Sequence, residues 1–196
     1  MPGKLYIALV HYPVYNKNSQ EISTSVTNLD LHDIARMAAT YGVERYFVVH
    51  PLEAQQRLVG EVLQYWREGF GSQYNPYRGQ AFDRLQVVAS VEEAARVIEE
   101  SEEAPLVSVS TTARRCEGSV SFTRVREMVE RKEHNFLLLF GTGWGLAQSV
   151  IDRTDYVLEP VEGNGDYNHL SVRSAVAIVL DRLLGKKWWL APLSSG

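Results

Sequence analysis

The residues best suited to hold a ligand gather in the last third of the chain, and they act through the backbone as much as through side chains. An apolar run at residues 135–140 leads into a glycine-rich turn at 141–145, Gly-Thr-Gly-Trp-Gly. A second apolar run at 156–161 leads into the polar loop 162–169. Glycine allows close approach of bare backbone, and a helix after each turn offers free N–H groups to a ligand. The pattern predicts a ligand site, and plain tight turns are the alternative.

A second polar group suits acid–base chemistry. His32 and Arg36 are four residues apart and Asp33 lies between them, so a helix would place the three on one side. An arginine can hold a phosphate, and Asp33 or His32 can accept a proton. An ordinary surface ion pair explains the same spacing, so both interpretations stay open.

Length and composition exclude several classes of protein. The 196 residues fit one domain, residues 1–196, with a sizeable core, and the net charge of −4 argues against a generic nucleic-acid binder. Cys116 is the only cysteine, so we expect no intramolecular disulfide and no metal cluster. No apolar run reaches the length of a membrane span, and the N-terminus does not look like a signal peptide. We therefore expect a cytoplasmic protein without a membrane partner.

The elements that must position these residues alternate along the chain. Apolar runs predict six strands, at residues 5–10, 45–50, 85–89, 106–110, 135–140 and 156–161. Amphipathic patterns predict helices between them, at residues 31–41, 53–68, from 91, 122–132 and from 170 or 171. Residues 15–27 and 70–81 are expected to be loops. The fold class is therefore α/β, a mostly parallel six-stranded sheet with helices on both faces, and its ligand crevice lies at the carboxyl ends of the strands.

Some side chains have local structural roles available. Asn28 or Asp30 can cap the first helix, and Ser171 can cap the last one. The tryptophans Trp144, Trp188 and Trp189 are expected in the core or in a dimer face.

Two C-terminal segments carry a resemblance to a known family. Residues 140–146, Phe-Gly-Thr-Gly-Trp-Gly-Leu, and residues 168–175, Asn-His-Leu-Ser-Val-Arg-Ser-Ala, resemble the paired motifs of the SPOUT superfamily of S-adenosylmethionine-dependent RNA methyltransferases. Nearly the whole chain resembles a stand-alone relative of the tRNA guanine-N1 methyltransferase group. Residues 27–36 are similar to the Asn…Arg motif of the tRNA ribose methylases, with wider spacing.

The resemblance implies a fold, a cofactor and a partner. The C-terminal part would form a deep trefoil knot, which is one of the rare exceptions to unknotted connectivity. The cofactor would be S-adenosylmethionine. The protein would be a homodimer whose active site is completed across the interface, and its substrate would be tRNA or rRNA.

The resemblance also implies roles for individual residues. Those that would line the cofactor pocket are Thr111, Phe140, Gly141, Thr142, Gly143, Leu158, Val161, Asn168, His169, Leu170 and Ser171. Arg36 would assist the acceptor, with Asp33 or His32 as the base. Those that would contact RNA are Arg78, beside Tyr74 and Tyr77, and a rim of Arg114, Arg115 and Arg173. For the loop that carries Arg78, packing onto a dimer partner is the alternative, and for each of the other three arginines it is an ordinary solvated charge.

Two other functions remain open from the sequence. A Rossmann-like dinucleotide oxidoreductase would need a Gly-x-Gly-x-x-Gly turn after its first strand, whereas this chain has His11-Tyr12-Pro13 there. A non-catalytic module of the same fold would bind the cofactor or RNA without transferring a methyl group.

Overall fold

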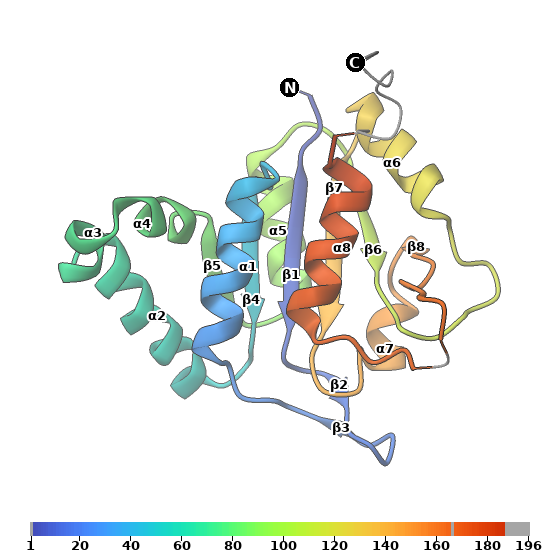
Figure 1. The fold of residues 1–196 in the computed structure, drawn as a ribbon, viewed down its shortest axis with the longest axis horizontal. Helices are drawn as coiled ribbons and strands as arrows, with labels where there is room; N and C mark the ends of the chain where they lie inside the picture. The colour runs from blue at the N-terminus through green and yellow to red at the C-terminus, as the bar shows by residue number, and fades with distance from the viewer. Residues whose placement is uncertain (1, 166, 187–196) are drawn as a thin grey trace, which may run out of the picture.

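A computed structural model of the chain describes residues 2–165 and 167–186. Its main feature is a six-stranded sheet of parallel strands in the order β5-β4-β1-β7-β6-β8 (Figure 1). The strands are β1 (Leu5–Val10), β4 (Arg45–Val49), β5 (Leu85–Val88), β6 (Leu106–Ser110), β7 (Asn135–Gly141) and β8 (Tyr156–Val157). The predicted parallel six-stranded sheet is confirmed.

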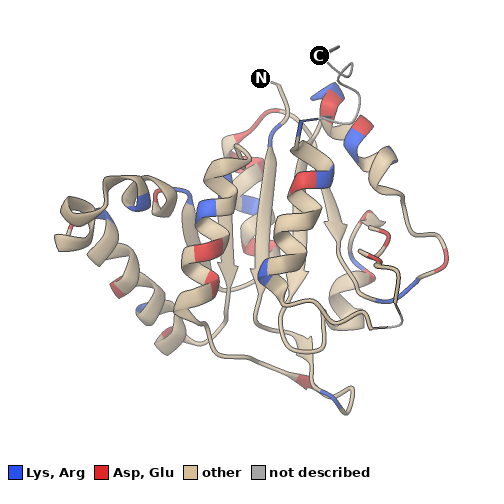
Figure 2. Ribbon diagram, in the orientation of Figure 1, with Lys and Arg blue, Asp and Glu red and all other residues tan. Residues whose placement is uncertain are grey.

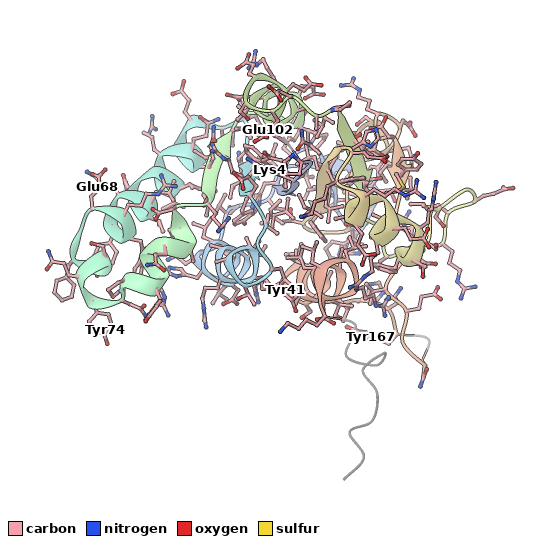
Figure 3. All side chains as sticks on the ribbon, turned by 90° about the horizontal axis from the view of Figure 1, so that it is seen from above. Lys4, Tyr41, Glu68, Tyr74, Glu102 and Tyr167 are labelled. Atoms are coloured by element: carbon pink, nitrogen blue, oxygen red, sulfur yellow. The ribbon has the colours of Figure 1, made fainter. Side chains whose placement is uncertain are left out.

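Helices cover both faces of this sheet, as expected. One face carries α1 (Asn28–Thr40), α2 (Glu53–Arg67), α6 (Phe122–Arg131) and α8 (Val172–Leu184). The other face carries α5 (Val91–Ser101) and the short α7 (Gln148–Ile151). Seen from above, α1 and α8 lie side by side on one side of the sheet, with α5 on the other side (Figure 3).

The central strand β1 shows why the apolar runs are continuous rather than alternating. Leu5, Ile7 and Leu9 pack into the core under α1 and α8. Tyr6, Ala8 and Val10 pack into the core under α5 and α7. A parallel strand covered by helices on both faces must be apolar at every position.

The chain path brings distant loops to one edge. β7 lies between β1 and β6, and β8 lies outside β6, so the chain moves inward after β6 and outward again after β7. Because the strands are parallel, the loops that follow β6, β7 and β8 meet at the same edge of the sheet. The trefoil knot that the resemblance implies stays a prediction.

The expected loop at residues 70–81 is instead two short helices, α3 (Phe70–Tyr74) and α4 (Pro76–Phe82). Asn75 caps α4 by accepting a hydrogen bond from the Arg78 N–H, and Pro76 starts the helix. A side chain at Gly71 would meet the rings of Tyr65 and Trp66 on α2. The Gly, Asn and Pro residues that suggested a loop therefore serve as helix caps and close-packing positions.

Two other expectations at element ends were wrong. Thr27, rather than Asn28 or Asp30, caps α1, because its hydroxyl accepts from the Asp30 N–H and donates to the Asp30 carboxylate. The strand expected at 156–161 is reduced to β8, followed by a single bridge between Leu158 and Val120. Pro160 has no N–H to extend a ladder.

The loop expected at residues 15–27 contains a small hairpin, β2 (Val14–Tyr15) and β3 (Glu21–Ile22). No helix in the described part of the chain has the length and apolar run that crossing a bilayer requires.

Candidate active site

A cavity of about 960 Å³ opens at the carboxyl ends of β6, β7 and β8. This volume lies within the range of small-molecule and cofactor sites. All eleven residues assigned to the cofactor from the sequence line it, from Thr111 through the glycine turn to Ser171. The fold thus gathers three loops that are far apart in the sequence into one site.

The glycine turn is built against the hairpin strand β2. Gly143 and Gly145 have positive φ values of 59° and 98°, which side chains other than glycine rarely adopt. The Trp144 N–H donates to the Tyr15 carbonyl at 2.9 Å, and the Tyr15 N–H donates to the Gly145 carbonyl at 2.9 Å. A Cβ at Gly141 would collide with the Leu146 backbone nitrogen. Glycine is therefore required by the geometry of the turn itself.

The loops on the other side of the cavity are also joined to each other. The Asn168 side-chain amide donates to the Ala113 carbonyl at 2.9 Å. Arg115 and Glu162 form an exposed two-bond ion pair at 2.5 and 2.7 Å. Ser171 accepts from the Ser174 N–H at 3.2 Å, which confirms its expected role as the N-cap of α8.

None of the three candidate catalytic residues lines the cavity of its own chain. The His32 ring packs edge-on against Trp66 and Phe82, and burial together with Arg78 lowers the pKa of this histidine. The Asp33 carboxylate lies 3.4 Å from the Arg173 guanidinium. Arg36 is exposed on α1, and its side chain forms no ion pair within residues 2–165 and 167–186.

The four arginines expected to contact RNA have different environments. Arg114 is exposed, lines the cavity and forms no ion pair with any described residue. Arg173 also lines the cavity, but its guanidinium lies 2.8 Å from the Asp30 carboxylate. Arg115 is paired with Glu162, and Arg78 lies over the Trp66 ring at 4.9 Å, away from the cavity. Basic and acidic residues are interspersed over the fold (Figure 2).

Asp30 is a cavity residue that sequence reasoning missed. Its side chain is 7% exposed, and its ion pair with Arg173 joins α1 to α8 across 143 residues of sequence. A pairing over such a distance leaves no local pattern, because it depends on how the two helices pack.

A polar chain lies beneath the cavity. His11 Nδ1 is 3.0 Å from the Thr24 hydroxyl, which is 2.5 Å from the Thr142 hydroxyl. His11 also stacks on His50 at 5.8 Å. Burial, and then the neighbouring His50, lower the pKa of His11 to about 4, so both rings are structural rather than exposed in the crevice.

Comparison with known families is consistent with this geometry. The family model for SAM-dependent RNA methyltransferases matches residues 4–185. The chain belongs to this RNA methyltransferase family. The resemblance seen in the two C-terminal motifs is therefore confirmed.

Relatives of this chain include longer proteins. A tRNA (guanine-N(1)-)-methyltransferase of Oleidesulfovibrio alaskensis is 45% identical over 185 residues, which cover 94% of this chain and 43% of that protein. An uncharacterized protein of Aquifex aeolicus is 37% identical over 182 residues, covering 93% of this chain and 89% of that protein. The chain thus spans less than half the length of the first relative.

Solved structures share the fold of this chain. A probable methylase family protein from Haemophilus influenzae Rd KW20 has a TM-score of 0.63 at 18% identity, over 93% of this chain and 66% of that one. The SpoU methyltransferase AviRb from Streptomyces viridochromogenes, in complex with AdoMet, has a TM-score of 0.59 at 16% identity, over 94% and 58%.

The cavity fits the family's cofactor. Phe140, Leu146 and Leu158 provide apolar walls for a ring. The backbone N–H groups of Gly143, Val161 and Leu170 have no hydrogen-bond partner among the residues described. They are available to the polar groups of a ligand such as S-adenosylmethionine.

Trp144 does not lie in the core, because its side chain is 57% exposed at the cavity. The other two tryptophans of this expectation, Trp188 and Trp189, lie outside the described residues.

Proposed function

We propose that this chain transfers a methyl group from S-adenosylmethionine to RNA, with tRNA as the substrate class. The observation that carries the proposal is the single cavity in which both C-terminal motifs meet. The name of the Oleidesulfovibrio relative supports tRNA.

The protein's own contribution is to align two molecules. S-adenosylmethionine supplies a methyl group that is already activated, so in-line placement of the acceptor is the main requirement. The glycine turn and the loops after β6 and β8 fix the donor through backbone groups. Arg114, without an ion-pair partner in the described chain, is suited to bind an RNA phosphate at the cavity rim.

The position of Arg36 outside the cavity supports a site that is completed by a second copy of the chain. Arg36 is exposed and lies outside the cavity of its own chain. We therefore propose a homodimer in which Arg36 of one copy acts at the cavity of the other. His32 is the weakest of the three candidates, because aromatic rings enclose it, and Asp33 is engaged with Arg173.

Two measurements test the proposal. Calorimetry with S-adenosylhomocysteine and with NAD should show binding of the first and none of the second; binding of NAD alone would favour the oxidoreductase.

Transfer of tritiated methyl groups into unfractionated tRNA and rRNA, taken from a strain that lacks the gene, should label tRNA. Cofactor binding without transfer to either RNA would favour the non-catalytic module. Mass mapping of the labelled nucleosides would then identify the modified atom.

A further inference from the structure

Trp144 is a large apolar ring kept in solvent at the cavity. Its side chain is 57% exposed, whereas Leu146, two residues later in the same turn, is 4% exposed. Exposure of one ring alone is ordinary, but this ring stands on a turn whose backbone is held on both sides.

The backbone around Trp144 has little freedom. The residues on either side, Gly143 and Gly145, both have positive φ, and a Cβ at Gly143 would lie 2.8 Å from the Tyr15 carbonyl oxygen. The Trp144 N–H is bonded to that same carbonyl at 2.9 Å, and the Gly145 N–H to the Thr142 carbonyl at 3.0 Å. These contacts fix the direction in which the Trp144 side chain leaves the turn. The Cα–Cβ bond of Trp144 therefore has a fixed direction at the rim of the cavity.

The other groups around the cavity match the parts of a nucleotide. Tyr167, on the opposite loop, is 80% exposed and also lines the cavity. Arg114 lines the same cavity and has no ion-pair partner among the described residues. Aromatic rings stack on unpaired bases, and a free guanidinium binds the phosphate beside them.

We propose that Trp144 is the stacking platform for the base of an unpaired or extruded nucleotide of the RNA substrate. The inference rests on the proposed methyltransferase function. A base within a duplex has its faces covered by its neighbours, so a ring at the cavity can stack only on a base that has left the helix. The substrate position is thus in a loop or in a strand that can be opened.

The test compares three variants at one position with one control. Trp144→Ala removes the ring, Trp144→Leu keeps an apolar side chain, and Trp144→Phe keeps an aromatic face. Tyr74→Ala removes a ring that is 77% exposed on α3, away from the cavity. The measurements are the Kd for S-adenosylhomocysteine by calorimetry, the Kd for unfractionated tRNA by filter binding in its presence, and the KM and kcat of transfer.

We expect Trp144→Ala and Trp144→Leu to weaken tRNA binding and raise its KM by about ten-fold or more, a loss typical of one stacked base. Trp144→Phe should recover most of this loss, Tyr74→Ala should change neither value, and the Kd for S-adenosylhomocysteine should stay within about two-fold in all four variants.

Three results would overturn the inference. The first is an unchanged tRNA affinity in Trp144→Ala. The second is equal tRNA affinity in Trp144→Leu and Trp144→Phe. The third is a loss of cofactor affinity together with RNA affinity, which would place the ring on the cofactor. A wild-type protein that binds no S-adenosylhomocysteine would instead refute the proposed function.

Discussion

Two regions of this molecule expose aromatic rings, and they are built differently. Trp144 and Tyr167 stand on loops at the cavity, whereas Tyr74 and Tyr77 stand on the short helices α3 and α4. Tyr74 and Tyr167 lie well apart along the horizontal axis of Figure 3. In the first region backbone hydrogen bonds fix the loops around an open space. In the second, helices pack on one another and leave their outer rings in solvent.

The glycines of the two regions show the same contrast. Gly71 and Gly79, in the α3–α4 region, lie against Trp66, so they allow helices to pack closely. Gly141 and Gly143 lie against backbone atoms of the cavity turn and of β2, so they allow a loop to close tightly beside a ligand. An exposed ring or a glycine therefore indicates function only together with the backbone that holds it.

The largest effect is expected at the cavity turn. In Gly141→Ala the new methyl group meets the Leu146 nitrogen, so the turn must open. We expect affinity for S-adenosylhomocysteine to fall about 100-fold or more, measured by calorimetry, because overpacking against backbone cannot be relieved by a rotamer change. The matched control is Gly60→Ala on α2, where a Cβ meets nothing within 4 Å. It should stabilise the protein by about 0.5–1 kcal/mol and leave binding unchanged. A cofactor affinity in Gly141→Ala equal to that of wild type would contradict the proposal that the glycine turn holds the cofactor.

The next largest effect is expected at Arg36 on α1, the helix between the two regions. Arg36→Ala should lower kcat about 100-fold or more while cofactor affinity is kept, because the acceptor loses its alignment. Arg96→Ala, which removes an exposed arginine of α5 on the other face of the sheet, is the control. Unchanged turnover in Arg36→Ala would refute the role of Arg36.

A mixing experiment sharpens this prediction. Arg36→Ala and Gly141→Ala chains, each inactive alone, should recover about a quarter of wild-type activity when co-expressed, since half of the dimers are mixed and each has one complete site. No recovery, despite formation of mixed dimers, would show that Arg36 does not act across an interface.

Two histidines, His11 beneath the cavity and His32 near α4, allow the pH dependence of stability to be compared between the two regions. The folded-state pKa of His11 is about 4, below its ordinary value of 6.5, chiefly because the ring is buried. Its stabilising contribution is therefore complete above about pH 6.5 and is lost as the pH falls toward 4, by about 3 kcal/mol in all. Between pH 7 and pH 4.5, the unfolding free energy from urea titrations should therefore fall more in wild type than in His11→Phe, which has no imidazole to protonate at this site. His32→Phe, in the less buried environment near α4, should change this pH dependence less; an equal change would show that the two sites are equivalent.

The smallest effect separates two arginines. Arg114→Ala should weaken tRNA binding about three- to five-fold and reduce the salt dependence by one phosphate contact. Arg78→Ala should leave RNA affinity unchanged and lower the melting temperature, because the Arg78 guanidinium packs over Trp66. Filter binding at several salt concentrations and thermal unfolding measure both. The reverse result would locate the RNA contact near α4.

Much of the fold follows from local pattern. The continuous apolar run of β1 predicts a strand covered on both faces, and the Ser171 cap predicts where the last helix begins. The two short helices at 70–82 were missed because Asn75 and Pro76 mark a helix start as readily as a turn.

The sequence by itself determined the order of the six sheet strands and of the longer helices along the chain, the glycine turn and the second motif, since these depend on periodicity and on backbone geometry within a few residues. Only the tertiary structure decided that the eleven residues expected to bind the cofactor share one cavity, that Arg173 pairs with Asp30, and that Arg36 lies outside the cavity of its own chain. The reason is physical. Contacts between residues more than 100 positions apart depend on strand order and helix packing, and side-chain spacing along the chain carries no information about either.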